Sequence, residues 1–209
     1  GSLSREIQKL IDTKKFTDGY KVELRGEIGI MNDSVKQLSI GFLLSIVLVY
    51  LILVTQFRSF IIPFIMMLTV PMGMVGIIFM FVLTNTYYSL QAGIGTIFLV
   101  GIAVSNGVLL IEFILHKLEH EGLPLDQAII DGAKARLRPI MMTSLASMLG
   151  LVPMAIGFGK GSEANIPLGR AVIGGQLLST SLTLFVLPTI FRFVYLRFID
   201  TAYAKGEIK

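Results

Sequence analysis

The sequence predicts an all-α membrane protein with five transmembrane helices. Of its 209 residues, 54% are hydrophobic and only 15% are charged, and the mean hydropathy of +0.77 lies outside the range of soluble domains. Five apolar segments each have about 20 residues, enough to cross a hydrocarbon core of roughly 30 Å as a helix. None shows the alternating pattern of barrel strands, so helices are the assignment that pairs every backbone group in lipid.

The predicted spans are separated by short polar loops, and their Gly and Pro residues are assigned structural roles. Glycines allow close approach of neighbouring helices, and prolines allow bends or helix starts. The spans cover residues 38–57, 60–84, 91–115, 139–158 and 171–195. The structural residues are Pro71 in the second span, Gly101 and Gly107 in the third, Pro139 at the start of the fourth, and Gly174 and Gly175 in the fifth.

A further amphipathic helix is predicted over residues 124–138. Its apolar residues recur at four-residue steps, at Leu125, Ile129, Ala133 and Leu137. Such a pattern is typical of a helix that lies on a membrane surface. We expect this one on the cytoplasmic side, because basic residues gather in that loop and in the C-terminal tail. The same count places Lys117 in the cytoplasm, and Lys160 and residues 1–37 on the opposite side.

The first 34 residues differ from the rest of the chain. Arg5–Ile11 is predicted to form a short helix, and alternation over residues 20–25 indicates a water-facing strand. Because a single strand is not a stable domain, we expect this segment to end a larger α/β domain outside the membrane.

Several function classes are excluded or disfavoured by composition. The 18 Lys and Arg residues stand against 14 Asp and Glu, but they lie in separate islands, which argues against a nucleic-acid partner. The chain has no cysteine, so thiol catalysis and disulfides are excluded. The lipid bilayer is the one partner that composition itself requires.

Ser105, Asn106, Thr143 and Ser144 are polar residues inside predicted spans. Their side chains can hydrogen-bond across helices or to their own backbone. The residues alone leave helix packing and a functional role equally open.

His116, Glu119 and His120 have the H-x-x-E-H spacing of one class of zinc peptidases. The chain has only two histidines, so a third protein ligand would be a carboxylate. We therefore assign no metal site and no cofactor. An intramembrane metalloenzyme remains one alternative, and a structural helical subunit of a membrane complex is another.

Two stretches resemble the resistance-nodulation-division (RND) efflux permeases, the acriflavine-resistance type that includes drug and heavy-metal branches. They are Gly101-Ile-Ala-Val-Ser-Asn-Gly-Val-Leu-Leu-Ile-Glu-Phe113 and Ala135-Arg-Leu-Arg-Pro-Ile-Met-Met-Thr-Ser-Leu-Ala146. By this resemblance, residues 35–198 are the last five helices of a twelve-helix permease. Residues 1–34 then close a periplasmic porter domain, and residues 199–209 form a cytoplasmic tail.

The resemblance implies a secondary transporter and not an enzyme. Such permeases are multi-pass homotrimers of the bacterial inner membrane, and they exchange protons for hydrophobic compounds, lipids or metal ions. Many work with a periplasmic adaptor and an outer-membrane channel. The missing N-terminal half of the permease is a further expected partner, and no substrate-binding residue is assigned here.

The resemblance also implies a proton relay. Thr143 and Arg136 match relay residues of the drug-exporting branch, and Asn106 matches as well. Ser105 stands where that branch has a lysine, so the relay departs from the drug exporters at this position. The acidic residues that take up protons would lie in the missing half.

Overall fold

The computed structural model describes residues 27–159 and 161–199. Within this described part every regular element is a helix, and no strand occurs. The chain divides into two compact units, Gly1–Leu43 and Leu44–Lys209. The helix and strand expected within residues 1–26, together with Lys160 and the tail from residue 200 onward, lie outside the described residues.

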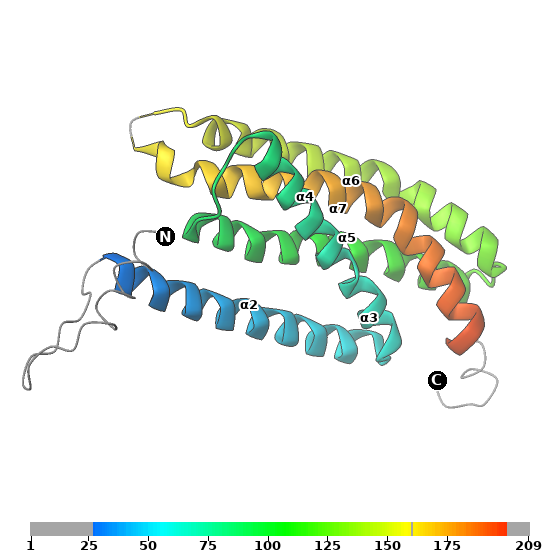
Figure 1. Cartoon of the computed structure of the whole chain (residues 1–209). Coiled ribbons are helices and arrows are strands. Elements are labelled where there is room, and N and C mark those ends of the chain that lie inside the picture. Colours follow the sequence, from blue (N-terminus) through cyan, green and yellow to red (C-terminus); the bar gives the residue numbers. More distant parts are fainter. Residues whose placement is uncertain (1–26, 160, 200–209) are drawn as a thin grey trace, which may run out of the picture. The chain divides into compact units, whose positions relative to one another are not determined.

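Within the described residues, five helical segments are long and apolar enough to cross a membrane, which agrees with the predicted number of spans (Figure 1). The second segment consists of two helices. The elements are α2 (Glu27–Phe57), α3 (Ile61–Met67), α4 (Thr69–Leu83), α5 (Leu90–His120), α6 (Leu125–Ile156), a 3₁₀ turn (Ser162–Asn165), α7 (Ile166–Val194) and a π-helical turn (Tyr195–Ile199).

The second predicted span is interrupted at Leu68, between α3 and α4. Pro71 has no backbone N–H to donate to the Met67 carbonyl, and its ring crowds that carbonyl. The α3 helix therefore ends at Met67. Close by, the Thr69 hydroxyl donates to the Met66 carbonyl at 2.7 Å, so a backbone acceptor at the interruption is paired within the protein.

The predicted amphipathic helix and the fourth span form one continuous helix, α6, instead of two elements. It passes through Pro139 without a break. Its N-terminal half packs tightly on α5, since a Cβ at Gly132 would lie 2.7 Å from the side chain of Ile114. This contact with α5 holds the part of α6 that precedes Pro139, whose ring removes one backbone hydrogen bond.

The face that α6 buries in this half differs from the predicted stripe. Ala128, Ile129 and Gly132 are buried, and Ile129 is the one residue that belongs to both sets. Leu137, the last residue of the predicted stripe, is 44% exposed. The recurrence of apolar residues at every fourth position therefore predicted the helix correctly. It did not predict the buried face, because contact with α5 decides which face is buried.

Helix α7 is the centre of the Leu44–Lys209 unit, where it packs against α4, α5 and α6 (Figure 1). Its approach to α4 depends on glycine, because a Cβ at Gly76 would lie 2.5 Å from the Gly174 carbonyl oxygen. A Cβ at Gly174 would meet the side chain of Met80, and one at Gly175 would meet Leu99. Both glycines thus lie at close helix contacts.

The two glycines singled out in the third span lie in different surroundings. A Cβ at Gly107 would lie 3.4 Å from Leu187 of α7, which is a tight but ordinary contact. At Gly101 no atom lies within 4 Å of the added Cβ, so no neighbouring helix requires a glycine there.

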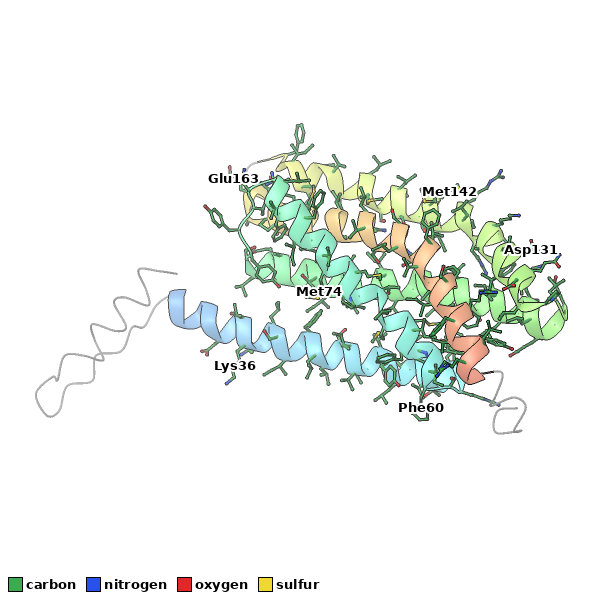
Figure 2. The ribbon with its side chains drawn as sticks, turned by 45° about the vertical axis from the view of Figure 1, so that its right-hand side comes forward. Lys36, Phe60, Met74, Asp131, Met142 and Glu163 are labelled. Carbon is green, nitrogen blue, oxygen red and sulfur yellow. The ribbon has the colours of Figure 1, made fainter. Side chains whose placement is uncertain are left out.

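The outer surface of α6 is largely apolar in the half that follows Pro139. Met142, labelled in Figure 2, points away from the bundle and is 70% exposed. Leu145, Leu149 and Ile156 are exposed on the same helix. An apolar exposed face is expected where a helix meets lipid or further transmembrane helices.

Candidate functional site

A pocket of about 350 Å³ opens between α5, α6 and α7 within the Leu44–Lys209 unit. Polar side chains from all three helices form part of its wall. The lining residues are Gly101, Ile102, Ser105, Asn106 and Leu109 of α5, Thr143 and Ser147 of α6, and Gln176 of α7. Spacings of four residues place the members from each helix on one face.

Thr143 and Ser147 face the pocket from consecutive turns of α6. The Thr143 hydroxyl donates to carbonyl oxygens of its own helix, at 3.0 Å from that of Pro139 and 3.1 Å from that of Ile140. Such bonding to the preceding turn is common for threonine inside helices.

Ser144 lies one residue further along α6 and joins the three helices. It is 1% exposed, and its hydroxyl lies 3.0 Å from the hydroxyl of Thr180 on α7. The amide of Asn106 on α5 donates to the same oxygen at 3.5 Å. The polar groups thus bond to one another, which lowers the cost of burying them among apolar helices.

Gln176 forms the part of the wall that belongs to α7. Its side-chain amide donates to the Ser147 hydroxyl oxygen at 2.7 Å, and that hydroxyl donates to the Ser144 carbonyl at 3.0 Å. Gln176 is 2% exposed, and its Oε1 is buried without a hydrogen-bond partner in the described part of the chain.

The four expected relay residues do not all meet. Ser105, Asn106 and Thr143 line the same pocket. Arg136 lies two turns from Thr143 along α6, a rise of roughly 10 Å. Its guanidinium carbon stacks 4.8 Å from the ring centroid of Phe113 on α5, an arrangement that stabilises a cation. Arg136 is therefore not part of the pocket wall.

Helix α7 contributes a buried polar face that was not predicted from the sequence. Gln176, Ser179, Thr180 and Thr183 are all buried. They follow the i, i+3, i+4, i+7 spacing of one helix face, in the middle of an apolar helix. A search for polar residues at helical spacing within the fifth span would have found this face.

The H-x-x-E-H segment forms the last turns of α5. The rings of His116 and His120 stack, with centroids 4.6 Å apart. Among residues 27–159 and 161–199, no group of three or more His, Asp or Glu side chains is placed to hold a metal ion.

Five apolar helical segments, three of which enclose a buried polar cluster, are typical of a multi-pass membrane protein. Residues 1–195 match the AcrB/AcrD/AcrF family. The chain therefore belongs to the RND efflux permeases, which are transporters, as the two sequence stretches predict.

The chain is similar to relatives named for swarming motility, metal resistance and multidrug resistance. The swarming motility protein SwrC of Bacillus subtilis is 36% identical over 91% of the chain, and the cobalt-zinc-cadmium resistance protein CzcA of Cupriavidus metallidurans is 35% identical over 93%. Each match covers 18% of the relative. The multidrug resistance protein MdtF of Escherichia coli is 37% identical over 72% of the chain and 14% of its own length.

A solved structure shows the same arrangement of helices. The crystal structure of a heavy metal efflux pump (crystal form II) superposes with a TM-score of 0.76 at 26% identity. This match covers 92% of the chain and 19% of the pump. The chain thus spans less than a fifth of the length of these relatives.

Proposed function

We propose that this chain is the C-terminal membrane half-domain of a proton-driven exporter. The exporter carries hydrophobic compounds, lipids or metal ions outward across the bacterial inner membrane. The observation that carries the proposal is the polar pocket between α5, α6 and α7, where three of the four residues implied by the family relay gather.

The lining of this pocket has polar groups but no acid or base. Its hydrogen-bonding residues are two serines, a threonine, an asparagine and a glutamine. Such side chains transmit or orient a proton, whereas storing one at neutral pH takes an ionisable group. In this proposal the carboxyl groups that load protons come from the other half of the permease and face this wall.

The domain assignment belongs to the same proposal. Residues 1–34 end the second periplasmic porter domain, residues 35–198 form the membrane part, and residues 199–209 form a cytoplasmic tail. The complete permease is a homotrimer that works with a periplasmic adaptor and an outer-membrane channel. Support comes from family membership and from the solved heavy metal efflux pump, which matches 92% of the chain.

The substrate class stays open between metals and organic compounds. Relatives named for cobalt, zinc and cadmium resistance and for multidrug resistance match at 35% and 37% identity, so similarity favours neither. Substrate selection in this proposal belongs to porter domains outside the chain.

The coupling is tested with the complete permease in proteoliposomes. We expect an imposed proton gradient to drive export of an organic dye or of divalent metal, and substrate addition to release protons from the loaded compartment. A potassium gradient with valinomycin, which sets a voltage without a pH difference, serves as the control. Export at the same rate after the proton gradient is dissipated would contradict proton coupling.

A further inference from the structure

One face of α6 carries two basic residues that are followed by apolar residues. Its members recur at steps of four or three positions, which places them along one side of the helix. They are Lys134, Arg138, Met141, Leu145 and Leu149, and all five are exposed. We call this stripe the outer face of α6. Met142, which Figure 2 shows pointing away from the bundle, borders it.

The two cations of the outer face are not neutralised. Neither Lys134 nor Arg138 forms an ion pair or a side-chain hydrogen bond within the described residues. Asp131, one turn before Lys134, is the nearest acid of α6 along the chain, and no ion pair joins the two. The outer face therefore presents two positive charges to at most one negative charge of its own helix.

Two other cations at the same end of the bundle have partners in the chain. Lys117, in the last turn of α5, pairs with Glu121 at 2.6 Å. Arg192, in the last turn of α7, pairs with Asp126 at 2.5 Å, and this contact lowers the pKa of Asp126 below its usual value. The free cations at this end are thus a property of the outer face of α6 and not of every basic residue nearby.

The spacing along α6 places the charges at the edge of the bilayer. From Arg138 to Ile156 the helix rises roughly 27 Å, and the hydrocarbon core of a bilayer is roughly 30 Å thick. When the apolar part of the outer face lies in hydrocarbon, Arg138 and Lys134 lie at the level of the lipid headgroups. In the proposed topology this is the cytoplasmic leaflet, whose surface carries negative charge.

We propose that the outer face of α6 binds an anionic phospholipid. Its phosphate lies between Lys134 and Arg138, and its acyl chains run along Met141, Leu145 and Leu149. A lipid fits better than free phosphate, because the apolar residues extend the site for roughly 16 Å beyond Arg138. An anionic lipid fits better than a zwitterionic one, because the ammonium group of the latter would meet two cations. Each basic residue near a headgroup strengthens such binding about fivefold.

The test uses the complete permease with a single cysteine at Leu145→Cys that carries a fluorophore. The permease is placed in phosphatidylcholine liposomes, and a fraction of the lipid is exchanged for lipid with brominated acyl chains, which quench on contact. We expect brominated phosphatidylglycerol to quench more strongly than brominated phosphatidylcholine at the same mole fraction. The preference should amount to about fivefold for each of the two cations.

Two double variants assign this preference to residues. Lys134→Gln/Arg138→Gln keeps good helix formers at both positions, and we expect its preference for phosphatidylglycerol to fall close to one. Lys117→Gln/Arg192→Gln is the matched control, because it removes the same charge from the same end but takes cations that are already paired. Its preference stays at the wild-type value. Lys134→Arg/Arg138→Lys, which keeps both charges, should also keep the preference.

The other outcomes would overturn the proposal. Equal quenching by the two lipids would show that the outer face does not recognise charge. Absence of quenching by either lipid would show that other helices of the permease cover this face. A preference that survives Lys134→Gln/Arg138→Gln, or that falls equally in the paired-cation control, would come from the field of the whole surface. The assay measures no transport, so its result is independent of whether export is driven by protons.

Discussion

The guanidinium Nη1 of Arg170 lies 2.7 Å from the hydroxyl of Thr86, although 84 residues separate the two. The same guanidinium group donates to the Thr84 carbonyl at 3.3 Å and, through Nε, to the Ala155 carbonyl at 3.1 Å. Arg170 thus joins the first turns of α7 to the ends of α4 and α6. A cation is favoured there, because the C-terminal ends of both helices carry partial negative charge.

Removing this guanidinium group is expected to loosen the bundle. Arg170→Met loses hydrogen bonds from a charged donor and leaves carbonyl acceptors unpaired, so we expect the free energy of unfolding to fall by about 2–4 kcal/mol. Thermal unfolding of the purified complete permease in detergent measures the change. Arg138→Met, at an exposed position of α6, is the control. Equal unfolding temperatures for the two variants would contradict the role of Arg170.

The α4–α7 contact predicts a sharp dependence on glycine. Gly174→Ala places a Cβ against the Met80 side chain and 2.9 Å from the Gly76 carbonyl oxygen. Overpacking of this kind costs about 1–3 kcal/mol of stability. Gly150→Ala, where no atom lies within 4 Å of the new Cβ, is expected to be neutral or slightly stabilising. The same unfolding assay compares the two, and a tolerated Gly174→Ala would show that the helices approach less closely.

The relay assignment predicts different effects at two pocket residues. Thr143→Ala removes a hydroxyl held in place by its own helix, and we expect proton-driven export to fall about tenfold or more, which is roughly 1.4 kcal/mol. Ser105→Ala removes an exposed hydroxyl that contributes at most a neutral hydrogen bond of about 1 kcal/mol, so its effect is mild.

Export rates of both variants at matched expression decide the relay assignment. Thr189→Val, which changes an exposed threonine bonded to its own helix, controls for the loss of a helical hydroxyl. Wild-type rates in Thr143→Ala would return that residue to helix packing.

The proposed topology predicts opposite labelling of two acidic positions. Asp131 and Glu163 lie at opposite ends of the helices of the Leu44–Lys209 unit (Figure 2). In a complete permease that otherwise lacks cysteine, an impermeant thiol reagent added outside the inner membrane should label Glu163→Cys and leave Asp131→Cys unmodified. Permeabilised cells provide the control in which both react. Labelling of position 131 in intact cells would reverse the orientation.

We propose that export in this family needs porter domains, together with proton-binding acidic residues that lie in the other half of the permease. We therefore expect proteoliposomes that contain only the 209-residue chain to show no proton-coupled efflux. Liposomes with the complete permease are the positive control. Efflux above the rate of empty liposomes would show that the pocket between α5, α6 and α7 suffices for transport.

The sequence predicted the helices well, because hydropathy and length determine what can cross a bilayer. The first span was expected to begin at residue 38, yet α2 begins at Glu27. The third was expected at residues 91–115, and α5 reaches His120. Hydropathy marks only the apolar part of a helix, whereas polar turns continue it beyond that part.

The candidate site was predicted in part. Ser105, Asn106 and Thr143 stood out as polar residues in apolar spans, and they share one pocket. Arg136 was grouped with them because the resemblance implies it, but its side chain lies over Phe113. Gln176 was missed, although its spacing to the other polar residues of α7 marks one helix face. That this amide meets the Ser147 hydroxyl of α6 is decided only by the tertiary structure.

The sequence by itself determined that the protein lies in a lipid bilayer, how many spans it has and to which family it belongs. These properties depend on composition and on short contiguous motifs. Only the tertiary structure decided that α6 runs unbroken through Pro139 and that α7 completes the pocket wall. The role of Arg170, whose hydrogen bonds join the start of α7 to the ends of α4 and α6, was also visible only in the tertiary structure. Each of these features depends on contacts between residues that are 15 to 84 positions apart, and helical periodicity carries no information about which faces meet.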